Sequence, residues 1–264
     1  MRTYVELAKA EFARYSTYRL AILAGVFTNS VFGFIRVSVL IAAITTAGGV
    51  MAGYTIQEAS TYVWLGQAFL SPIVMYGWTE IADRVKSGEI AVDLARPVDL
   101  QLSWWARDLG RAAFALPTRG IPPFLIGALV VGVALPASWT AYPLGLFSLV
   151  VGVSISFTLR FLVNLIAFWT LDIQGYVNLY VVLLGLLSGF YVPVHIFPGW
   201  LQTIAFASPF PAMFQSPIDV MSGRVLGVEA LGVIGVQLGW LAGLVALARV
   251  VLGRATRRLV VQGG

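Results

Sequence analysis

The sequence predicts an all-α membrane protein whose six transmembrane helices form one domain over residues 1–264. Composition is the first reason: 59% of the residues are hydrophobic and 11% are charged, against roughly 25% charged residues in soluble domains. The second reason is that apolar residues occur in runs near the 20 or so that one crossing needs. Six crossings and their connections use most of the 264 residues, so we expect no separate soluble domain.

The N-terminal segment, residues 1–19, is predicted to form an amphipathic helix that lies in the membrane surface. Tyr4 and Phe12 fall on one helical face, and most of the charged residues fall elsewhere. Glu6 and Lys9 interrupt the apolar run that a signal peptide would require.

The six spans follow from the apolar runs. We expect them at residues 20–46, 59–81, 124–135, 144–170, 176–192 and 231–252. Pro72 is expected to kink the second span. Pro117, Pro122 and Pro123 are expected to break or bend the helix that begins after Asp99, so the third span is predicted to be discontinuous.

The segment between the fifth and sixth spans, residues 193–229, mixes prolines with aromatic residues. This mixture favours short helices that dip into a membrane interface over another full crossing. We therefore expect an external re-entrant hairpin here.

The basic residues predict the orientation. Thirteen of the 17 Lys and Arg residues lie before the first span, between the second and third, or after the last, whereas the three connections on the other side of the membrane contain Arg224 alone. By the positive-inside rule both termini are cytoplasmic, as is the connection at residues 80–99. This bias accounts for the net charge of +5, so no nucleic-acid partner is expected.

The cytoplasmic connection, EIADRVKSGEIAVDLARPVD (80–99), is the most polar stretch of the chain. Gly88 predicts the C-terminal end of a short helix, Pro97 a stop, and Asp99 the N-cap of the next helix. The connection also has an apolar side, formed by Ile81, Val85, Ile90, Val92 and Leu94. A merely solvated loop would not need such a side, so we favour a structured protein-binding element; a simple solvated connection is the alternative.

Polar residues also recur inside the spans. One series has a period of four and comprises Ser148, Gly152, Ser156, Arg160 and Asn164. In the first span, Asn29 and Arg36 share a face, so the two series could line one cavity. Alternatively, the small residues permit close helix contact, and the two arginines snorkel or pair with an acid such as Glu58, Glu80 or Asp172.

The sequence offers no catalytic constellation and no metal site. The single histidine, His195, lacks the spaced glutamate of a zinc motif and is expected to be a packing or interfacial residue. No G-x-x-x-x-G-K-[ST] motif occurs, and cysteine is absent. Energy from ATP would therefore have to come from another subunit.

Four stretches give the chain a family resemblance: SGEIAVDLARPVDLQL (87–102), NLIAFWT (164–170), FPGWL (197–201) and RRLVVQGG (257–264). Together with the predicted order of surface helix, six spans, charged connection and irregular outer segment, they make the chain similar to the permease subunits of ABC-2-type (type-2) ABC exporters, in a bacterial branch of that family. The resemblance covers essentially the full length.

The resemblance implies that residues 80–99 form a coupling element in a groove of a separate ATPase subunit. Two copies of that subunit would bind ATP and Mg, so this chain would need no cofactor of its own. Their closure would move spans one, two and five through the coupling element. The residues assigned to ATPase coupling are Glu80, Asp83, Arg84, Lys86, Ile90, Val92, Asp93, Leu94 and Arg96.

The resemblance also implies a second permease, identical or paralogous, in the lipids of a bacterial cytoplasmic (inner) membrane. Phe197, Trp200 and Phe206 are assigned to an external gate. The assigned substrate pathway comprises Asn29, Arg36, Ser156, Arg160 and Asn164. Charge in the first span departs from the usual family pattern, and we take Arg36 and Arg160 to favour an anionic or amphipathic substrate.

Three alternatives remain: a protein of a different class, a binding-protein-dependent importer, and an intramembrane enzyme. The main one is an ATP-independent channel, scramblase or scaffold, which copurification of a P-loop subunit would exclude. An importer is disfavoured because EALGVIG (229–235), which faintly resembles an importer loop, falls on the outer side. An intramembrane enzyme is disfavoured for want of catalytic groups. The sequence does not identify the substrate.

Overall fold

A computed structural model describes residues 1–17, 19–74, 77–170 and 172–262. Residues 75 and 76 of the expected second span and the last two residues of RRLVVQGG lie outside the described residues. The described chain is helical apart from one antiparallel pair of short strands, so the predicted all-α class is confirmed.

The elements follow one another along the chain in two groups. The first group is α1 (Arg2–Tyr15), α2 (Arg19–Thr46), β1 (Val50–Met51), β2 (Tyr54–Thr55), α3 (Ile56–Ile73), α4 (Glu80–Lys86), α5 (Ile90–Ala95) and α6 (Leu100–Ala115). The second group is the π-helical turn η1 (Leu116–Gly120), α7 (Ile121–Val130), α8 (Ala141–Leu165), the 3-10 turn η2 (Ile166–Phe168), α9 (Gln174–Leu187), the 3-10 turn η3 (Val194–Ile196), α10 (Gly199–Phe206), α11 (Phe210–Met213), α12 (Gln215–Met221) and α13 (Gly227–Gln262).

Within the described residues, four helical runs are long and apolar enough to cross a membrane. They are Leu20–Thr46, Leu100–Val130, Ala141–Phe168 and Gly227–Arg258. These runs overlap the expected first, third, fourth and sixth spans. The helices at the expected second and fifth spans, α3 and α9, are not among the four; α9 has 14 residues.

The predicted break in the third span is wrong. Helix α6, the π-turn η1 and α7 form one uninterrupted run, which starts at Leu100 and ends at Val130 rather than at residue 135. Pro117 lies in the π-turn, whose wider winding alters the hydrogen-bond pattern. Pro122 and Pro123 follow in the first turn of α7, where a missing N–H costs least.

The second span also differs from its prediction. Helix α3 begins at Ile56, behind a capping box that Thr55 makes with Glu58, and ends at Ile73 instead of residue 81. Val74 adopts a left-handed conformation, with φ 55°. Pro72 therefore lies in the last turn and does not kink the helix midway.

A tight contact at Trp64 joins three of these helices. The Trp64 side chain is fully buried. A Cβ atom added to Gly33 of α2 would lie 2.4 Å from the Trp64 ring, and one added to Gly127 of α7 would lie 1.9 Å from it. The absence of side chains at these two glycines therefore lets α2 and α7 close on α3.

The outer segment consists of short helices, as predicted, but part of it is core. Phe214 and Ile218, from the α11–α12 region, are fully buried, and α11 and α12 pack against α8 and α13. The expected re-entrant hairpin is therefore not shown.

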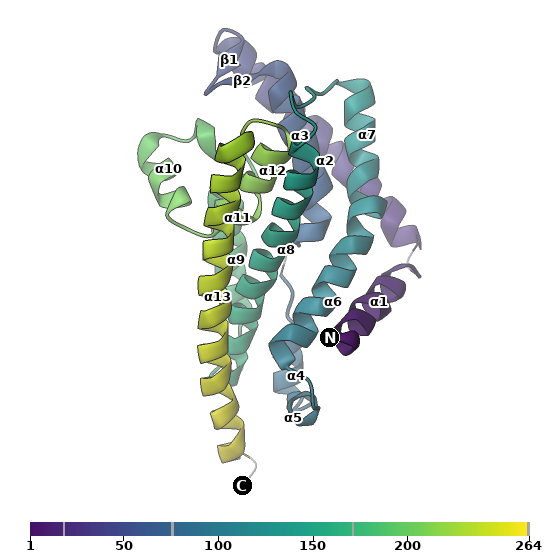
Figure 1. Cartoon of the computed structure of the whole chain (residues 1–264), viewed down its shortest axis with the longest axis vertical. Helices are drawn as coiled ribbons and strands as arrows, with labels where there is room; N and C mark the ends of the chain where they lie inside the picture. Colours follow the sequence, from purple (N-terminus) through teal and green to yellow (C-terminus); the bar gives the residue numbers. More distant parts are fainter. Residues whose placement is uncertain (18, 75–76, 171, 263–264) are drawn as a thin grey trace.

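Figure 1 shows how the two ends of the bundle differ. Helices α4 and α5 lie at the same end as the C-terminal part of α13, and β1, β2 and α10 lie at the opposite end. Helix α1 packs along α6. The contact is close because a Cβ atom on Gly110 would lie 2.0 Å from the Ala8 carbonyl oxygen.

Candidate functional site

Helices α4 and α5 form a structured element, with one side turned into the protein. Ile81, Ala82 and Ile90 are fully buried. Gly88, between the two helices, has φ 80°, the left-handed conformation that ends a helix at low steric cost. The Asp99 side chain accepts a hydrogen bond from the Leu102 N–H at 2.7 Å, which confirms it as the N-cap of α6.

Ion pairs hold α4 and α5 together. Arg84 binds the carboxylate of Asp93 and also lies 2.9 Å from Glu89. The hydrogen bond to Asp93 raises the pKa of the Arg84 guanidinium. Arg96 lies 3.4 Å from the other Asp93 oxygen. These contacts keep the two short helices in one fixed arrangement.

The nine residues assigned to coupling divide into two sets. Ile90 and Asp93 are buried, and Glu80, Arg84 and Leu94 are partly buried. The exposed set comprises Asp83, Lys86, Val92 and Arg96. Val92 is 59% exposed, which is high for an apolar side chain in a polar element. This exposed set is the surface that a partner protein could contact.

Asn164 fastens this element to the membrane helix α8. Its side-chain oxygen accepts a hydrogen bond from the Ala82 N–H of α4 at 3.0 Å, and its amide nitrogen donates to the Trp78 carbonyl at 2.7 Å. Asn164 is fully buried. A displacement of α4 must therefore move α8 or break the hydrogen bond between Asn164 and Ala82.

A group of charges beside Asn164 extends this connection to two more helices. Asp108 of α6 lies 2.9 Å from Arg160 of α8 and 2.9 Å from Arg111. Arg111 also donates to the carbonyls of Ser71 and Pro72, at 2.8 Å and 2.6 Å, at the end of α3. We call Asp108, Arg111, Arg160 and Asn164 the inner polar cluster. It joins α3, α4, α6 and α8.

The polar series on α8 proves to be a set of contacts with neighbouring helices. Ser148 donates to Gln237 of α13 at 2.7 Å, and Ser156 donates to the Ile73 carbonyl of α3. A Cβ atom on Gly152 would lie 2.6 Å from the Met213 carbonyl oxygen. Arg160 pairs with Asp108, so the three acids considered from the sequence were wrong for Arg160.

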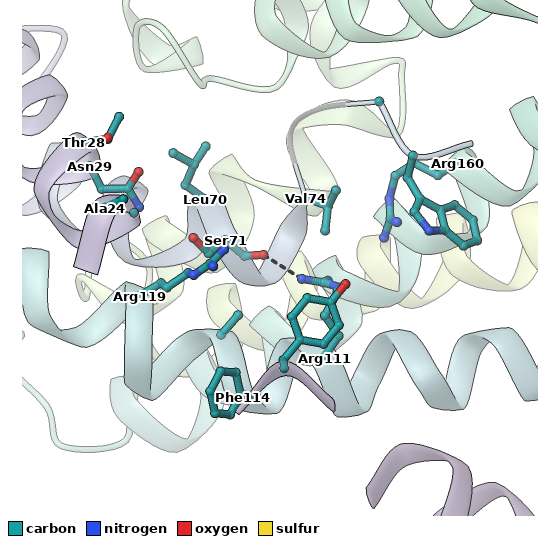
Figure 2. Close-up of a pocket in the computed structure, with 15 residues that line it drawn as sticks. Ala24, Thr28, Asn29, Leu70, Ser71, Val74, Arg111, Phe114, Arg119 and Arg160 are labelled. Carbon is teal, nitrogen blue, oxygen red and sulfur yellow. Dashed lines mark hydrogen bonds between the residues drawn. The ribbon is translucent and has the colours of Figure 1, made fainter. Parts of the chain in front are cut away.

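A pocket of about 500 Å³ lies between α2, α3, α6 and η1, and we call it the arginine pocket (Figure 2). Asn29 and Arg160, two of the five residues assigned to the substrate pathway, line it together with Arg111 and Arg119. Its apolar wall includes Leu70, Val74 and Phe114. The structure thus brings Asn29 and Arg160 to one cavity.

The other assigned pathway residues do not line this pocket. Ser156 and Asn164 make the helix contacts given above. Arg36 donates to the Phe190 carbonyl and lies over the Phe190 ring, with its guanidinium carbon 4.8 Å from the ring centroid. It therefore connects α2 with the segment after α9.

At the opposite end, a second group of polar side chains is buried. Gln215 accepts from the Tyr62 hydroxyl at 2.7 Å and from the Val194 N–H at 3.0 Å, and donates to Asp219 at 2.8 Å. Asp219 lies 2.8 Å from Nε2 of His195. We call Tyr62, His195, Gln215 and Asp219 the outer polar cluster, and its packing agrees with the structural role expected for His195.

Of the residues assigned to an external gate, Phe206 lies next to this cluster. Phe197 packs against the core, and the Phe206 ring lies 5.7 Å from that of His195. Trp200 is 67% exposed. Phe206 and Trp200 thus both expose aromatic surface, and Phe206 does so beside the outer polar cluster.

Asp108, Arg111 and Arg119 were missed from the sequence as members of the inner polar cluster or the arginine pocket. Asp108 and Arg111 carried a sequence signal, since opposite charges three residues apart face each other on a helix. Arg119 carried one too, because an arginine inside a span is costly unless it meets protein or water. The signal of Arg119 was overlooked because the adjacent prolines predicted a break in the helix, which placed Arg119 outside the expected span.

A comparison with curated proteins gives no match. A comparison with protein families matches residues 32–263 to the ABC-2 family transporter proteins. The matched region includes α4, α5 and the inner polar cluster and omits α1 and the first part of α2. Because the match extends over most of the 264 residues, the chain belongs to the ABC-2 family of transporter proteins.

Proposed function

We propose that this chain is the permease subunit of an ATP-driven exporter and that a separate ATPase subunit drives it through α4 and α5. The observation that carries the proposal is the pair of hydrogen bonds from Asn164 to Ala82 and Trp78. They fasten a polar element with an exposed outer face to a membrane helix. Force applied to that face would reach α8 directly, and α3 and α6 through the inner polar cluster.

Membrane components of the ABC-2 family lack ATPase domains, which is why the proposal assigns ATP and Mg to a partner. Two copies of a cytoplasmic ATPase subunit would bind them. A second permease, identical or paralogous, would complete the substrate pathway. The complex would lie in a bacterial inner membrane, with both termini of this chain in the cytoplasm.

Six crossings would require α3 and α9 to join the four long apolar runs. Helix α3 has 18 residues, which gives a length of about 27 Å. Nearly all of its residues from Ala59 to Ile73 are buried, so its polar side chains would face protein and not lipid. The short α9 would need the residues after it to complete a crossing.

The exposed set on α4 and α5 is the proposed ATPase contact. Val92 would enter an apolar site on the partner, and Asp83 and Lys86 would lie at its rim. Arg84 and Asp93 are instead proposed to keep the two helices rigid, since they bind each other. Rigidity matters here because a flexible loop would absorb the movement of the ATPase without transmitting it.

Copurification tests this proposal. The tagged chain would be solubilised gently from its native cells, the copurifying proteins identified by mass spectrometry, and ATPase activity measured in lipid nanodiscs. We expect a P-loop subunit with the wild type and its loss with Val92→Asp. Val50→Asp is the matched control, because Val50 is 54% exposed at the opposite end of the molecule, against 59% for Val92.

Two outcomes would overturn the proposal. If no P-loop subunit accompanies the wild type, an ATP-independent channel, scramblase or scaffold replaces the exporter. If the subunit stays bound to Val92→Asp as it does to Val50→Asp, α5 is not its docking site. For the pathway, Arg36→Ala and Arg160→Ala are each expected to slow transport of an anionic or amphipathic substrate, and unchanged rates would remove both residues from it.

A further inference from the structure

Arg119 is the least compensated charge of the arginine pocket. Asp108 balances Arg111 and Arg160, each at 2.9 Å, and Arg111 also binds two carbonyl groups. Arg119 makes no ion pair or side-chain hydrogen bond with the described part of the chain, yet it is partly buried. Three guanidinium groups and no carboxylate line the described pocket, which therefore has an excess of positive charge.

The depth of Arg119 makes this charge costly. A helix crosses the hydrocarbon region in about 20 residues. Counted back from Val130, where α7 ends, that length reaches the neighbourhood of Gly110, so Arg119 lies near the middle of the crossing. An arginine at that depth needs water, protein or a ligand around it, and the pocket provides the space.

The packing around Arg119 directs it toward the pocket. Gly25 of α2 lies beside it, and a Cβ atom on Gly25 would be 3.4 Å from Cδ of Arg119. Figure 2 shows the Arg111 and Arg119 side chains extending into the pocket from the α6–η1 run, with Arg160 at its other end. The π-turn η1 supplies the position of Arg119, and such turns often occur at functional sites.

The lining around these arginines suits one kind of ligand. Thr28, Asn29 and Ser71 add polar side chains near Arg119, and Leu70, Val74 and Phe114 add apolar surface. The planar guanidinium group matches the oxygens of a phosphate or a carboxylate. Outside the pocket, the neighbouring face of α2 exposes Leu23 and Phe27, which an acyl chain could contact.

We propose that the arginine pocket binds an oxyanion, with Arg119 as its principal ligand and Arg111 and Arg160 as fixed positive charges beside it. The oxyanion belongs either to the headgroup of an anionic lipid or to a small soluble phosphate. The apolar wall places the rest of an amphiphile against α2. The idea that the bound oxyanion is a transported substrate rests on the proposed transport function. The binding of an oxyanion in the pocket does not depend on that function.

The test measures binding to the full-length purified chain without ATP or ATPase, so that it stands apart from the transport proposal. A fluorescent short-chain phosphatidic acid and the matched phosphatidylcholine would be titrated in detergent. We expect the wild type to prefer phosphatidic acid, and Arg119→Gln to weaken that binding by about tenfold or more, as for a lost charge-assisted hydrogen bond. Arg254→Gln, a change at an exposed position of α13, is the control and should bind as the wild type does.

Two further arms sharpen the outcome. Arg119→Lys keeps the positive charge but loses the planar guanidinium group, so we expect it to bind phosphatidic acid with intermediate affinity. If Arg119→Gln fails to fold, Arg119→Lys replaces it in the comparison with the wild type. Competition by millimolar inorganic phosphate would identify a soluble anion as the ligand, and absence of competition would identify the lipid headgroup. Equal binding by wild type, Arg119→Gln and Arg119→Lys would overturn the proposal, as would equal losses for phosphatidic acid and phosphatidylcholine.

Discussion

The inner and outer polar clusters bury similar numbers of polar side chains in different ways. The inner cluster is built on ion pairs, with Asp108 held between Arg111 and Arg160. The outer cluster is built around an amide, since Gln215 contacts Tyr62, Asp219 and the Val194 backbone. Removal of one charged partner leaves the other charge buried and uncompensated, whereas removal of one neutral partner leaves a single unsatisfied dipole.

This difference matches the roles proposed for the two ends. The inner cluster joins four helices next to α4 and α5, where the proposed force enters. Strong, mutually dependent contacts would make those helices move together. The outer cluster joins α3 to the η3 and α12 region, and its weaker contacts could exchange as that end rearranges. We therefore expect variants of the inner cluster to cost more stability than variants of the outer cluster.

Asp108→Asn should have the largest effect. It removes the charge that compensates Arg111 and Arg160, and breaking a buried pair in this way typically costs about 3–5 kcal/mol. Thermal unfolding in detergent would measure the loss. Asp83→Asn, at an exposed position that bonds Thr79, is the control and should stay within about 1 kcal/mol. A similar shift for both variants would contradict the difference between the clusters.

Asn164→Leu should rank second and should act locally. It leaves the Ala82 N–H and the Trp78 carbonyl without their side-chain partner, and each unsatisfied buried group costs about 1–3 kcal/mol. Hydrogen exchange at the Ala82 amide of α4 should accelerate more than exchange at the amides of α8. Asn178→Leu, on the exposed side of α9, should leave that amide protected. An unchanged rate in Asn164→Leu would show that α4 is held by other contacts.

Much of the fold could be predicted from the sequence because bilayer length leaves a strong signal. The runs at α2, α8 and α13 are long and apolar, and they were found near their observed positions. The break expected near Pro117 was wrong because a π-turn accommodates a proline that an ideal α-helix would not. The end of α3 was missed because Ile81 continues the apolar pattern while belonging to α4.

The candidate site was harder to predict because it depends on contacts between distant segments. Helical spacing correctly placed Arg160 and Asn164 on one face, but spacing within a helix does not reveal what that face contacts. Asp108 lies 52 residues from Arg160 in sequence, and Ala82 lies 82 residues from Asn164. Both the Arg160 and Asn164 side chains therefore connect helices, and of the two only Arg160 also lines the arginine pocket.

Tyr62→Phe tests the outer cluster at a member whose side chain is almost fully buried. The Tyr62 hydroxyl lies 2.6 Å from the Gly189 carbonyl and 2.7 Å from Gln215. Its loss should cost about 1–2 kcal/mol, because the ring still fills its place and the groups left behind are neutral. Tyr142→Phe, at a position that is 47% exposed, is the matched control and should unfold as the wild type does. A loss of stability as large as that of Asp108→Asn would contradict the proposed difference between the inner and outer polar clusters.

His195→Ala should have the smallest effect of the four variants. The His195 side chain is 30% exposed, and Asp219 keeps its hydrogen bond from Gln215 at 2.8 Å when the imidazole is removed. We expect a loss of about 1 kcal/mol, measured by the same thermal unfolding. Asp219→Ala should cost more than His195→Ala, because it removes a partner from both His195 and Gln215. The reverse order would mean that the imidazole, and not the amide of Gln215, is the centre on which the outer polar cluster depends.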